Sequence, residues 1–235
     1  MSPTQKRRAR QPHQLPPGRH GLPRGFVESN QRQRILDAVA DVTSLAGYAE
    51  MSVEDIIVTA GVSRRTFYDN FKDKEEAFLA AYDEIVAHLT KRIQEAFEGA
   101  NTFPGRVRDC LAVFLGFLAS EPRFAELCIV EVFAAGPRAL ERRNAVMRAF
   151  AQLIRTAAEE LGEGARRPPE LTAETIVGGV YEVVYSRVLG GESAAVIELQ
   201  QDLAYSMMLP YLGHAAAARE AAKPPSVQVT AAESA

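Results

Sequence analysis

The sequence predicts an all-α protein built from two domains. Apolar residues recur at spacings of three and four along most of the chain, which is the period of an amphipathic helix. No segment alternates apolar and polar residues for long enough to predict a strand. Prolines and glycines separate the periodic segments, as expected at helix boundaries. We therefore expect about nine helices, of which the first three form a separate small domain.

Three short helices are expected in residues 29–74. Polar residues suited to cap a helix precede each apolar stripe, and glycines end the first two stripes. The predicted caps are Ser29 or Asn30, Ser52 and Ser63, and the predicted ends are Gly47 and Gly61. The third helix covers residues 63–71, and its only apolar pair is Phe67 and Phe71.

A larger helical domain is expected in residues 75–213. A long helix begins at the cap Asp73 and runs to about Phe97, a length of roughly 37 Å that carries it from the first domain into the second. Further helices are expected at about residues 105–119, 122–135, 137–161, 172–189 and 194–212.

Both ends of the chain are expected to be flexible. Residues 1–28 contain five prolines and little apolar surface, so we interpret them as a flexible basic arm. Glu28 is the only acidic residue before residue 35, although the whole chain carries a net charge of −3. Residues 214–235 follow the last periodic segment and are interpreted as a disordered tail.

Composition restricts the class of protein. The chain has 235 residues, of which 47% are hydrophobic and 24% charged, as in globular domains. Cys110 and Cys128 lie in apolar helical sequence, so we expect small buried hydrophobic residues in a reducing cytoplasm, with no disulfide and no metal site. No apolar run is long enough for a signal peptide or a membrane span. We expect no cofactor and no membrane partner.

Residues 52–74 have the pattern of a helix-turn-helix. In this motif the second helix packs one face on the preceding helices and turns the other toward base edges in the major groove. Phe67 and Phe71 are four residues apart and would face inward. The residues left for base contacts are Arg64, Arg65, Thr66 and Asn70. Arginine suits guanine, threonine the thymine methyl group and asparagine adenine.

Phosphate contacts are predicted around the same motif. Ser52 and Ser63 begin helices, whose free backbone N–H groups can hold phosphates. Tyr68 and Lys74 could donate to phosphates from the helix face and from just beyond the motif. The alternatives are a solvated helix face for the arginines and Asn70, and a packing role for Tyr68. Together these residues predict binding to double-stranded DNA.

The stretch "SVEDIIVTAGVSRRTFYDNFKDKEEAFLAAYDE" strongly resembles the tetracycline-repressor (TetR) family of bacterial regulators. It contains that family's Gly-Val turn, the following Ser, the Thr-aromatic-Tyr triplet, a Phe and then Asp-Lys-Glu. The resemblance covers residues 33 to about 84. It implies base contacts from Arg64, Arg65, Thr66 and Asn70, and phosphate contacts from Ser52, Tyr68 and Lys74. Asp69 stands where the family often has a larger or basic residue, which puts its contact in doubt.

The basic arm offers a further DNA contact. Its segment "GRHGLPRGF" could place Arg19 or Arg24 in the adjacent minor groove, as homeodomain arms do. The alternative is a tail that adds only nonspecific positive charge.

A homodimer is expected, because one short recognition helix contacts too few base pairs for useful specificity. The candidate interface residues are Ile176, Val180, Val184, Leu199, Leu203 and Met207. The TetR resemblance implies that the last two helices pair with their mates in a four-helix bundle. The alternative is that these side chains belong to the core of their own chain.

The TetR resemblance also implies a ligand cavity in the second domain. The candidate lining residues are Phe114, Phe117, Glu131, Phe133, Phe150, Tyr181 and Tyr185. Aromatic residues at helical spacing can equally be plain core. Glu131 interrupts an apolar run, so it is either a surface residue or a buried carboxylate for a cationic or hydroxyl-bearing ligand.

These patterns favour a sequence-specific transcription regulator, most simply a repressor that a small-molecule effector releases from a palindromic operator. Activation stays open, since it depends on where the operator lies. An enzyme is disfavoured, because the four histidines are scattered and no phosphate loop or nucleophile motif is present. No catalytic residue is predicted. The other alternative is an architectural DNA-binding protein that needs no ligand.

Overall fold

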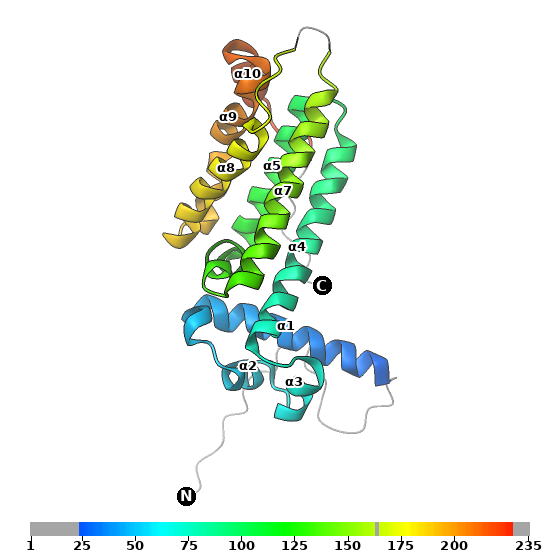
Figure 1. Ribbon diagram of the computed structural model, residues 1–235, viewed down its shortest axis with the longest axis vertical. Helices are drawn as coiled ribbons and strands as arrows, with labels where there is room; N and C mark the ends of the chain where they lie inside the picture. The colour runs from blue at the N-terminus through cyan, green and yellow to red at the C-terminus, as the bar shows by residue number, and fades with distance from the viewer. Residues whose placement is uncertain (1–23, 163–164, 228–235) are drawn as a thin grey trace, which may run out of the picture.

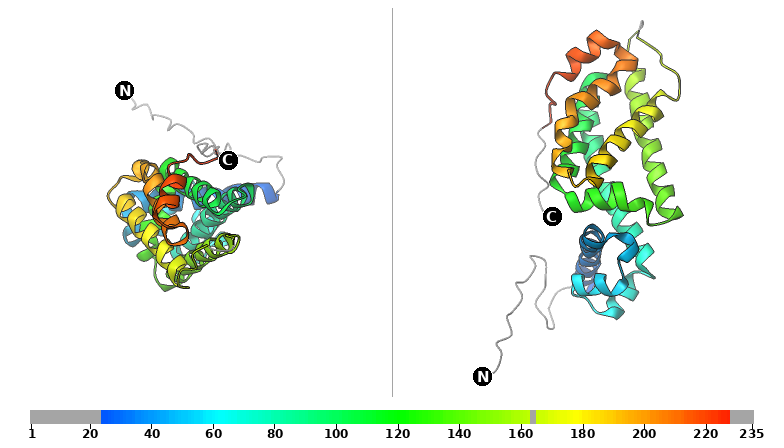
Figure 2. Two further views of the ribbon diagram at one scale, coloured as in Figure 1. Left: turned by 90° about the horizontal axis from the view of Figure 1, so that it is seen from above. Right: turned by 90° about the vertical axis from the view of Figure 1, so that its left-hand side faces the viewer.

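The computed structural model describes residues 24–162 and 165–227, and in these ranges the chain is all-helical, as predicted. Figures 1 and 2 show a small lower domain and a larger upper domain joined along one long helix. The lower domain contains α1 (Arg24–Glu50), α2 (Val53–Ala60), α3 (Arg64–Asn70) and the start of α4 (Lys74–Gly99). The upper domain contains the rest of α4, α5 (Phe103–Ser120), α6 (Pro122–Ala125), α7 (Pro137–Glu159), α8 (Thr172–Leu189), α9 (Gln200–Leu212) and α10 (His214–Ala221).

The lower domain closes around the third helix. Phe67 and Phe71 are 0% and 3% exposed, so the predicted inward pair is confirmed. They lie in one apolar cluster with residues of α1, α2 and the first turns of α4. The opposite face of α3 is therefore left in solvent.

Capping side chains fix the ends of these short helices. Ser52 and Asp55 form a capping box at the start of α2, and Ser63 caps α3. Gly61 ends α2 in the left-handed conformation, with φ 61° and ψ 38°, which a residue without a Cβ adopts at little cost. Gly47, at φ 77°, ends the regular part of α1. These positions agree with the boundaries expected from the sequence.

The start of α1 was predicted too late. The helix begins at Arg24, before the expected caps Ser29 and Asn30. No proline follows Pro23 in this segment, so nothing interrupts the helical hydrogen bonds once the chain has passed that residue.

The predicted helix over residues 122–135 is not regular. It consists of α6, a π-helical turn η1 (Glu126–Val130) and a 3₁₀ turn η2 (Glu131–Phe133). Leu127 and Val132 from these turns are fully buried in the core of the lower domain. Ile129, two residues after Leu127, belongs to the core of the upper domain. The segment therefore packs against both domains at once.

The predicted disordered tail was wrong for its first part. Residues 214–221 form α10, which packs against α9 and α5 with Ala217 and Ala221 buried. Arg108 on α5, only 9% exposed, forms an ion pair with Glu220 at 3.0 Å. The backbone N–H of Ser226 donates to Asp109 at 2.7 Å. Alanine favours helix, and burial of the small side chains together with these polar contacts orders the segment.

Candidate DNA-binding surface and ligand cavity

The outer face of α3 presents two arginines to solvent. The side chain of Arg65 is 90% exposed and that of Arg64 is 68% exposed. Arg64 lies 3.3 Å from Glu54 and 5.8 Å from the centre of the Tyr68 ring, while Arg65 lies 3.7 Å from Asp69. Exposed pairs of this kind are weak and exchange readily for phosphate or base contacts. This face has the shape and charge of a recognition helix.

The other predicted contact residues around α3 also serve the helix itself. The amide of Asn70 donates to the Thr66 carbonyl at 2.8 Å, and the Thr66 hydroxyl lies 2.8 Å from that of Ser63. Ser52 and Ser63 both lie in exposed positions at helix starts. Tyr68 is 48% exposed, so its hydroxyl is not committed to the core.

Two basic residues near the motif have a role that sequence reasoning missed. Lys74 donates to the carbonyls of Tyr48 at 3.1 Å, Ala49 at 3.2 Å and Met51 at 2.8 Å. All three of its N–H bonds are thus used to hold the end of α1, which argues against the predicted phosphate contact. Arg34 similarly donates to the carbonyls of Ala60 and Gly61 in the turn of the motif.

The predicted minor-groove residues cannot be placed. Arg19 and the side chain of Arg24 lie outside the described residues. The minor-groove contact of the arm stays a prediction.

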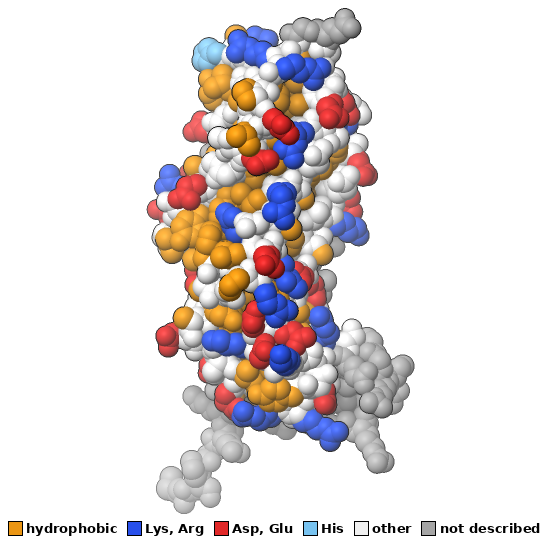
Figure 3. Space-filling view, in the orientation of Figure 1, with side chains coloured by type: hydrophobic (Ala, Val, Ile, Leu, Met, Phe, Trp, Pro, Cys, Tyr) orange, Lys and Arg blue, Asp and Glu red, His pale blue; other side chains and the backbone are white. Residues whose placement is uncertain are grey.

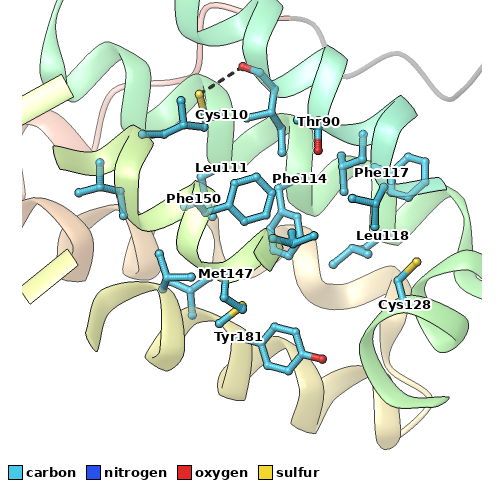
Figure 4. Close-up of a pocket in the computed structure, with 18 of the residues that line it drawn as sticks. Thr90, Cys110, Leu111, Phe114, Phe117, Leu118, Cys128, Met147, Phe150 and Tyr181 are labelled. Carbon is cyan, nitrogen blue, oxygen red and sulfur yellow. Dashed lines mark hydrogen bonds between the residues drawn. The ribbon is translucent and has the colours of Figure 1, made fainter. Parts of the chain in front are cut away.

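The upper domain contains an apolar cavity of about 150 Å³ between α4, α5, α7 and α8, with one wall completed by η1 (Figure 4). Four of the seven predicted lining residues border it: Phe114, Phe117, Phe150 and Tyr181. The rings of Phe114 and Phe150 approach each other from α5 and α7, with centroids 6.5 Å apart. This is the kind of concave apolar site that suits a small molecule.

The residues that border the cavity extend along most of α7. Residues of α7 border it at helical spacing from Arg143 through Phe150 to Ala157, a span of about 21 Å at the rise of an α-helix. Both cysteines also border it, and burial raises the pKa of the Cys110 thiol to about 12. Burial likewise raises the pKa of the Tyr181 hydroxyl, which donates to the Ile129 carbonyl at 2.7 Å. Along its middle, the wall therefore carries no charge near neutral pH.

Three predicted lining residues lie elsewhere. Phe133 is 46% exposed and packs its ring edge against Tyr181 and Tyr185, outside the cavity wall. Glu131 points away from the cavity and accepts a hydrogen bond from the backbone N–H of Tyr48 at 2.6 Å. Its carboxylate also lies about 3.4 Å from the position that a Cβ on Gly47 would occupy. Neither reading of Glu131 from the sequence anticipated a contact with the lower domain.

Comparison with known proteins agrees with this arrangement. Residues 35–81 match the family model of bacterial regulatory proteins of the tetR family. The HTH-type transcriptional regulator EthR of Mycolicibacterium smegmatis is 29% identical over 154 residues, which cover 63% of this chain and 70% of that protein. The N-terminal part of this chain is a DNA-binding domain of the TetR family of regulators.

Two further relatives extend the similarity through the second domain. The fatty acid metabolism regulator protein of Bacillus subtilis is 20% identical over 72% of this chain and 90% of its own length. The transcriptional regulator FadR from Bacillus subtilis, in complex with stearoyl-CoA, superposes with a TM-score of 0.65 and 20% identity, covering 77% of this chain and 98% of that one. The TetR fold thus continues beyond the matched N-terminal residues.

Four of the six predicted dimer residues of this chain face inward. Val184 and Leu203 are 0% and 7% exposed, and Val180 and Met207 border the cavity. Val184 and Leu203 are thus buried within their own chain, whereas Val180 and Met207 are partly buried and their interface role stays a prediction. A cavity needs apolar side chains on every wall, which accounts for the surplus of apolar residues on α8 and α9. Ile176 and Leu199 are only half-buried.

The outer side of α8 carries a different set of residues. Val183, Leu189 and, in the 3₁₀ turn η3 (Ser193–Leu199), Ile197 are 39%, 58% and 41% exposed. Figure 3 shows apolar side chains gathered at the left edge of the molecule, over the lower end of α8 in Figure 1. Gly178 and Gly179 lie on the same helix with open space around them.

No helix in the described part of the chain is long and apolar enough to cross a membrane.

Proposed function

We propose that this chain is a TetR-family repressor that binds a palindromic operator as a homodimer and is released by an elongated apolar effector. The exposed face of α3 supplies base readout for one half-site. The exposed apolar side chains and glycines of α8 supply a surface on which a second copy can pack closely. Such a protein would act in the cytoplasm, where bacterial DNA lies.

The observation that carries the effector proposal is the dual packing of η1 and η2. Cys128 and Ile129 border the cavity, whereas Leu127 and Val132 are buried in the core of the lower domain. An effector that pushes on η1 must therefore also disturb the packing beneath α1. Close-packed cores transmit such displacements because they have little free space to absorb them.

Polar contacts continue this path to the DNA-binding motif. The carboxylate of Glu131 in η2 accepts a hydrogen bond from the backbone N–H of Tyr48. Lys74 donates to the carbonyl of Tyr48 and to those of the residues that follow it, Ala49 and Met51. Arg123 on α6 pairs with Asp41 of α1 at 2.7 Å. The chain then passes directly into Ser52, the cap of α2. A shift of η2 would thus change the placement of the motif within the dimer, and with it the spacing of two recognition helices.

The shape of the cavity favours an unbranched aliphatic chain. Its lining extends along about four turns of α7 and consists mainly of apolar side chains. A similar protein of Bacillus subtilis is named for fatty acid metabolism, and FadR of that organism was solved in complex with stearoyl-CoA. We infer that the effector is a long-chain acyl compound, and that it is bound and released without chemical change.

Operator binding in the presence of acyl compounds tests the proposal. Purified protein is titrated onto a labelled genomic fragment that it selects, with and without hexadecanoate or hexadecanoyl-CoA, and the complex is followed by fluorescence anisotropy. We expect at least one compound to lower operator affinity about tenfold or more. An affinity that neither compound changes would contradict the effector proposal. Light scattering of the free protein should give the mass of a dimer.

A further inference from the structure

Two arginines border the cavity, far apart along it. Arg143 lies near the start of α7, and Arg106 on α5 pairs with Glu160 just beyond the end of α7 at 2.5 Å. The intervening residues of α7 span about 25 Å. The cavity therefore has a guanidinium near each end and apolar walls between them.

Arg106 is already paired with a carboxylate and with two backbone carbonyls of the protein. Besides Glu160, its Nε donates to the carbonyls of Phe97 at 3.1 Å and Ala100 at 3.0 Å. The guanidinium also lies 4.4 Å from the centre of the Phe97 ring. Its charge is balanced by a carboxylate, so it has no need of a ligand.

Arg143 is held in place but not neutralised. Its guanidinium lies 4.0 Å from the centre of the Tyr181 ring and 5.0 Å from that of Phe133. It donates to the neutral amide oxygen of Asn144 at 3.1 Å and lies close enough to the Tyr181 hydroxyl to lower the pKa of that group, and both partners are uncharged near neutral pH. Its Nε is buried without a hydrogen-bond partner in the described part of the chain. No carboxylate among the described residues lies within ion-pair distance of it.

A partly buried cation without a counter-ion is costly, and a ligand that supplies an anion removes that cost. The planar fork of an arginine binds a carboxylate or a phosphate through two parallel hydrogen bonds. The flanking rings pre-orient the guanidinium, so little freedom is lost on binding. Phe133 is partly exposed, which places this end of the cavity nearer to solvent than its apolar middle.

We propose that Arg143 is the anion anchor of the cavity: it binds the negatively charged head group of the effector and directs the apolar tail toward Arg106. This inference rests on the proposed acyl effector and adds its polarity and orientation. The shared chemistry is an oxyanion, supplied either by the carboxylate of a free fatty acid or by a phosphate of an acyl-CoA. Neutral molecules of the same length leave Arg143 unpaired and bind more weakly.

The test compares three probes with one aliphatic chain length: dodecanoate, dodecanol and dodecanoyl-CoA. Calorimetric titration measures their affinities for the wild type, Arg143→Gln and Arg143→Lys. Arg148→Gln is the matched control, because Arg148 lies on the same helix in an exposed position and does not border the cavity. Thermal unfolding checks that each variant is folded.

We expect the wild type to prefer at least one anionic probe over dodecanol, and Arg143→Gln to lose about tenfold to 100-fold of affinity for that probe alone. Arg143→Lys should restore part of the preference, and Arg148→Gln should match the wild type. Selective loss for dodecanoate identifies a carboxylate anchor, and selective loss for dodecanoyl-CoA a phosphate anchor.

Two results would overturn the inference in different ways. Equal wild-type affinity for all three probes, or a preference that survives in Arg143→Gln, removes the anchor and leaves the acyl effector in place. Binding of none of the probes removes both the acyl effector and the anchor.

Discussion

At the scale of single residues, positive charge near the motif is divided between two tasks. Arg64 and Arg65 extend into solvent. Arg34 and Lys74 instead donate hydrogen bonds to backbone carbonyls inside the lower domain. The sequence pattern places Arg64, Arg65 and Lys74 near DNA, but it cannot show which carbonyls lack partners at the ends of α1 and α2. That information exists only once the helices are packed.

Arg65→Ala should weaken operator binding without affecting stability. The side chain is 90% exposed and has only a weak ion pair to lose. Loss of a base contact costs about 1–3 kcal/mol, or about 5-fold to 150-fold in affinity. Anisotropy with a selected operator measures the change, and Lys91→Ala, on the exposed surface of α4, is the control. Wild-type affinity for Arg65→Ala would remove this residue from base readout.

At the scale of elements, the segment from α6 to η2 is the part that sequence periodicity describes least well. Its apolar residues suggest one regular helix, but some of them pack into the core of the lower domain and others into the core of the upper domain. A π-helical turn shifts the register of side chains within a helix, and such turns occur often at functional sites. Tertiary packing therefore overrides the local pattern at the point where the two domains meet.

Glu131→Ala should weaken the coupling between effector binding in the upper domain and operator binding by the lower domain. The variant leaves the N–H of Tyr48 without its acceptor, which should lower the free energy of unfolding by about 1–3 kcal/mol. Effector affinity should persist, because Glu131 does not border the cavity. The effector should then change operator affinity less than in the wild type. Denaturant unfolding and operator titration measure both effects, with Glu141→Ala on the exposed face of α7 as the control. Unchanged effector response would contradict the coupling.

α10 was not foreseen, because its alanine-rich sequence has too little apolar surface to predict docking. Its attachment depends on Glu220, whose pKa is lowered first by the hydrogen bond from Lys223 and also by Arg108. A folded pKa below the ordinary value means that the ionised form stabilises the fold. This contribution is present above the unfolded pKa and is lost as pH falls through the folded pKa.

Glu220→Gln should therefore destabilise the protein by about 1–2 kcal/mol at pH 7, where it weakens the pair with buried Arg108. The difference from the wild type should shrink as pH falls below about 4, because the wild-type carboxyl is then protonated as well. Thermal unfolding across pH measures this, with exposed Glu198→Gln as the control. A difference that does not depend on pH would show that the charge of Glu220 is not what holds α10.

At the scale of the whole molecule, the sequence was sufficient for the fold class, the helix-turn-helix and its inward pair of phenylalanines. It was not sufficient for the second domain. Val184 and Leu203 have the composition of an interface, yet they lie in the core of their own chain. Apolar periodicity shows that a face is buried, but not whether a cavity, a neighbouring helix or a second subunit buries it.

Selection of genomic DNA fragments by the purified protein tests whether α3 recognises a base sequence and whether a dimer recognises that sequence at two half-sites. One inverted repeat should be enriched and bound at least about 1,000-fold more tightly than bulk DNA. Its two halves should lie about one helical turn, or a multiple of it, apart. Enrichment of no common sequence, or equal affinity for bulk DNA, would contradict the account and favour an architectural DNA-binding protein.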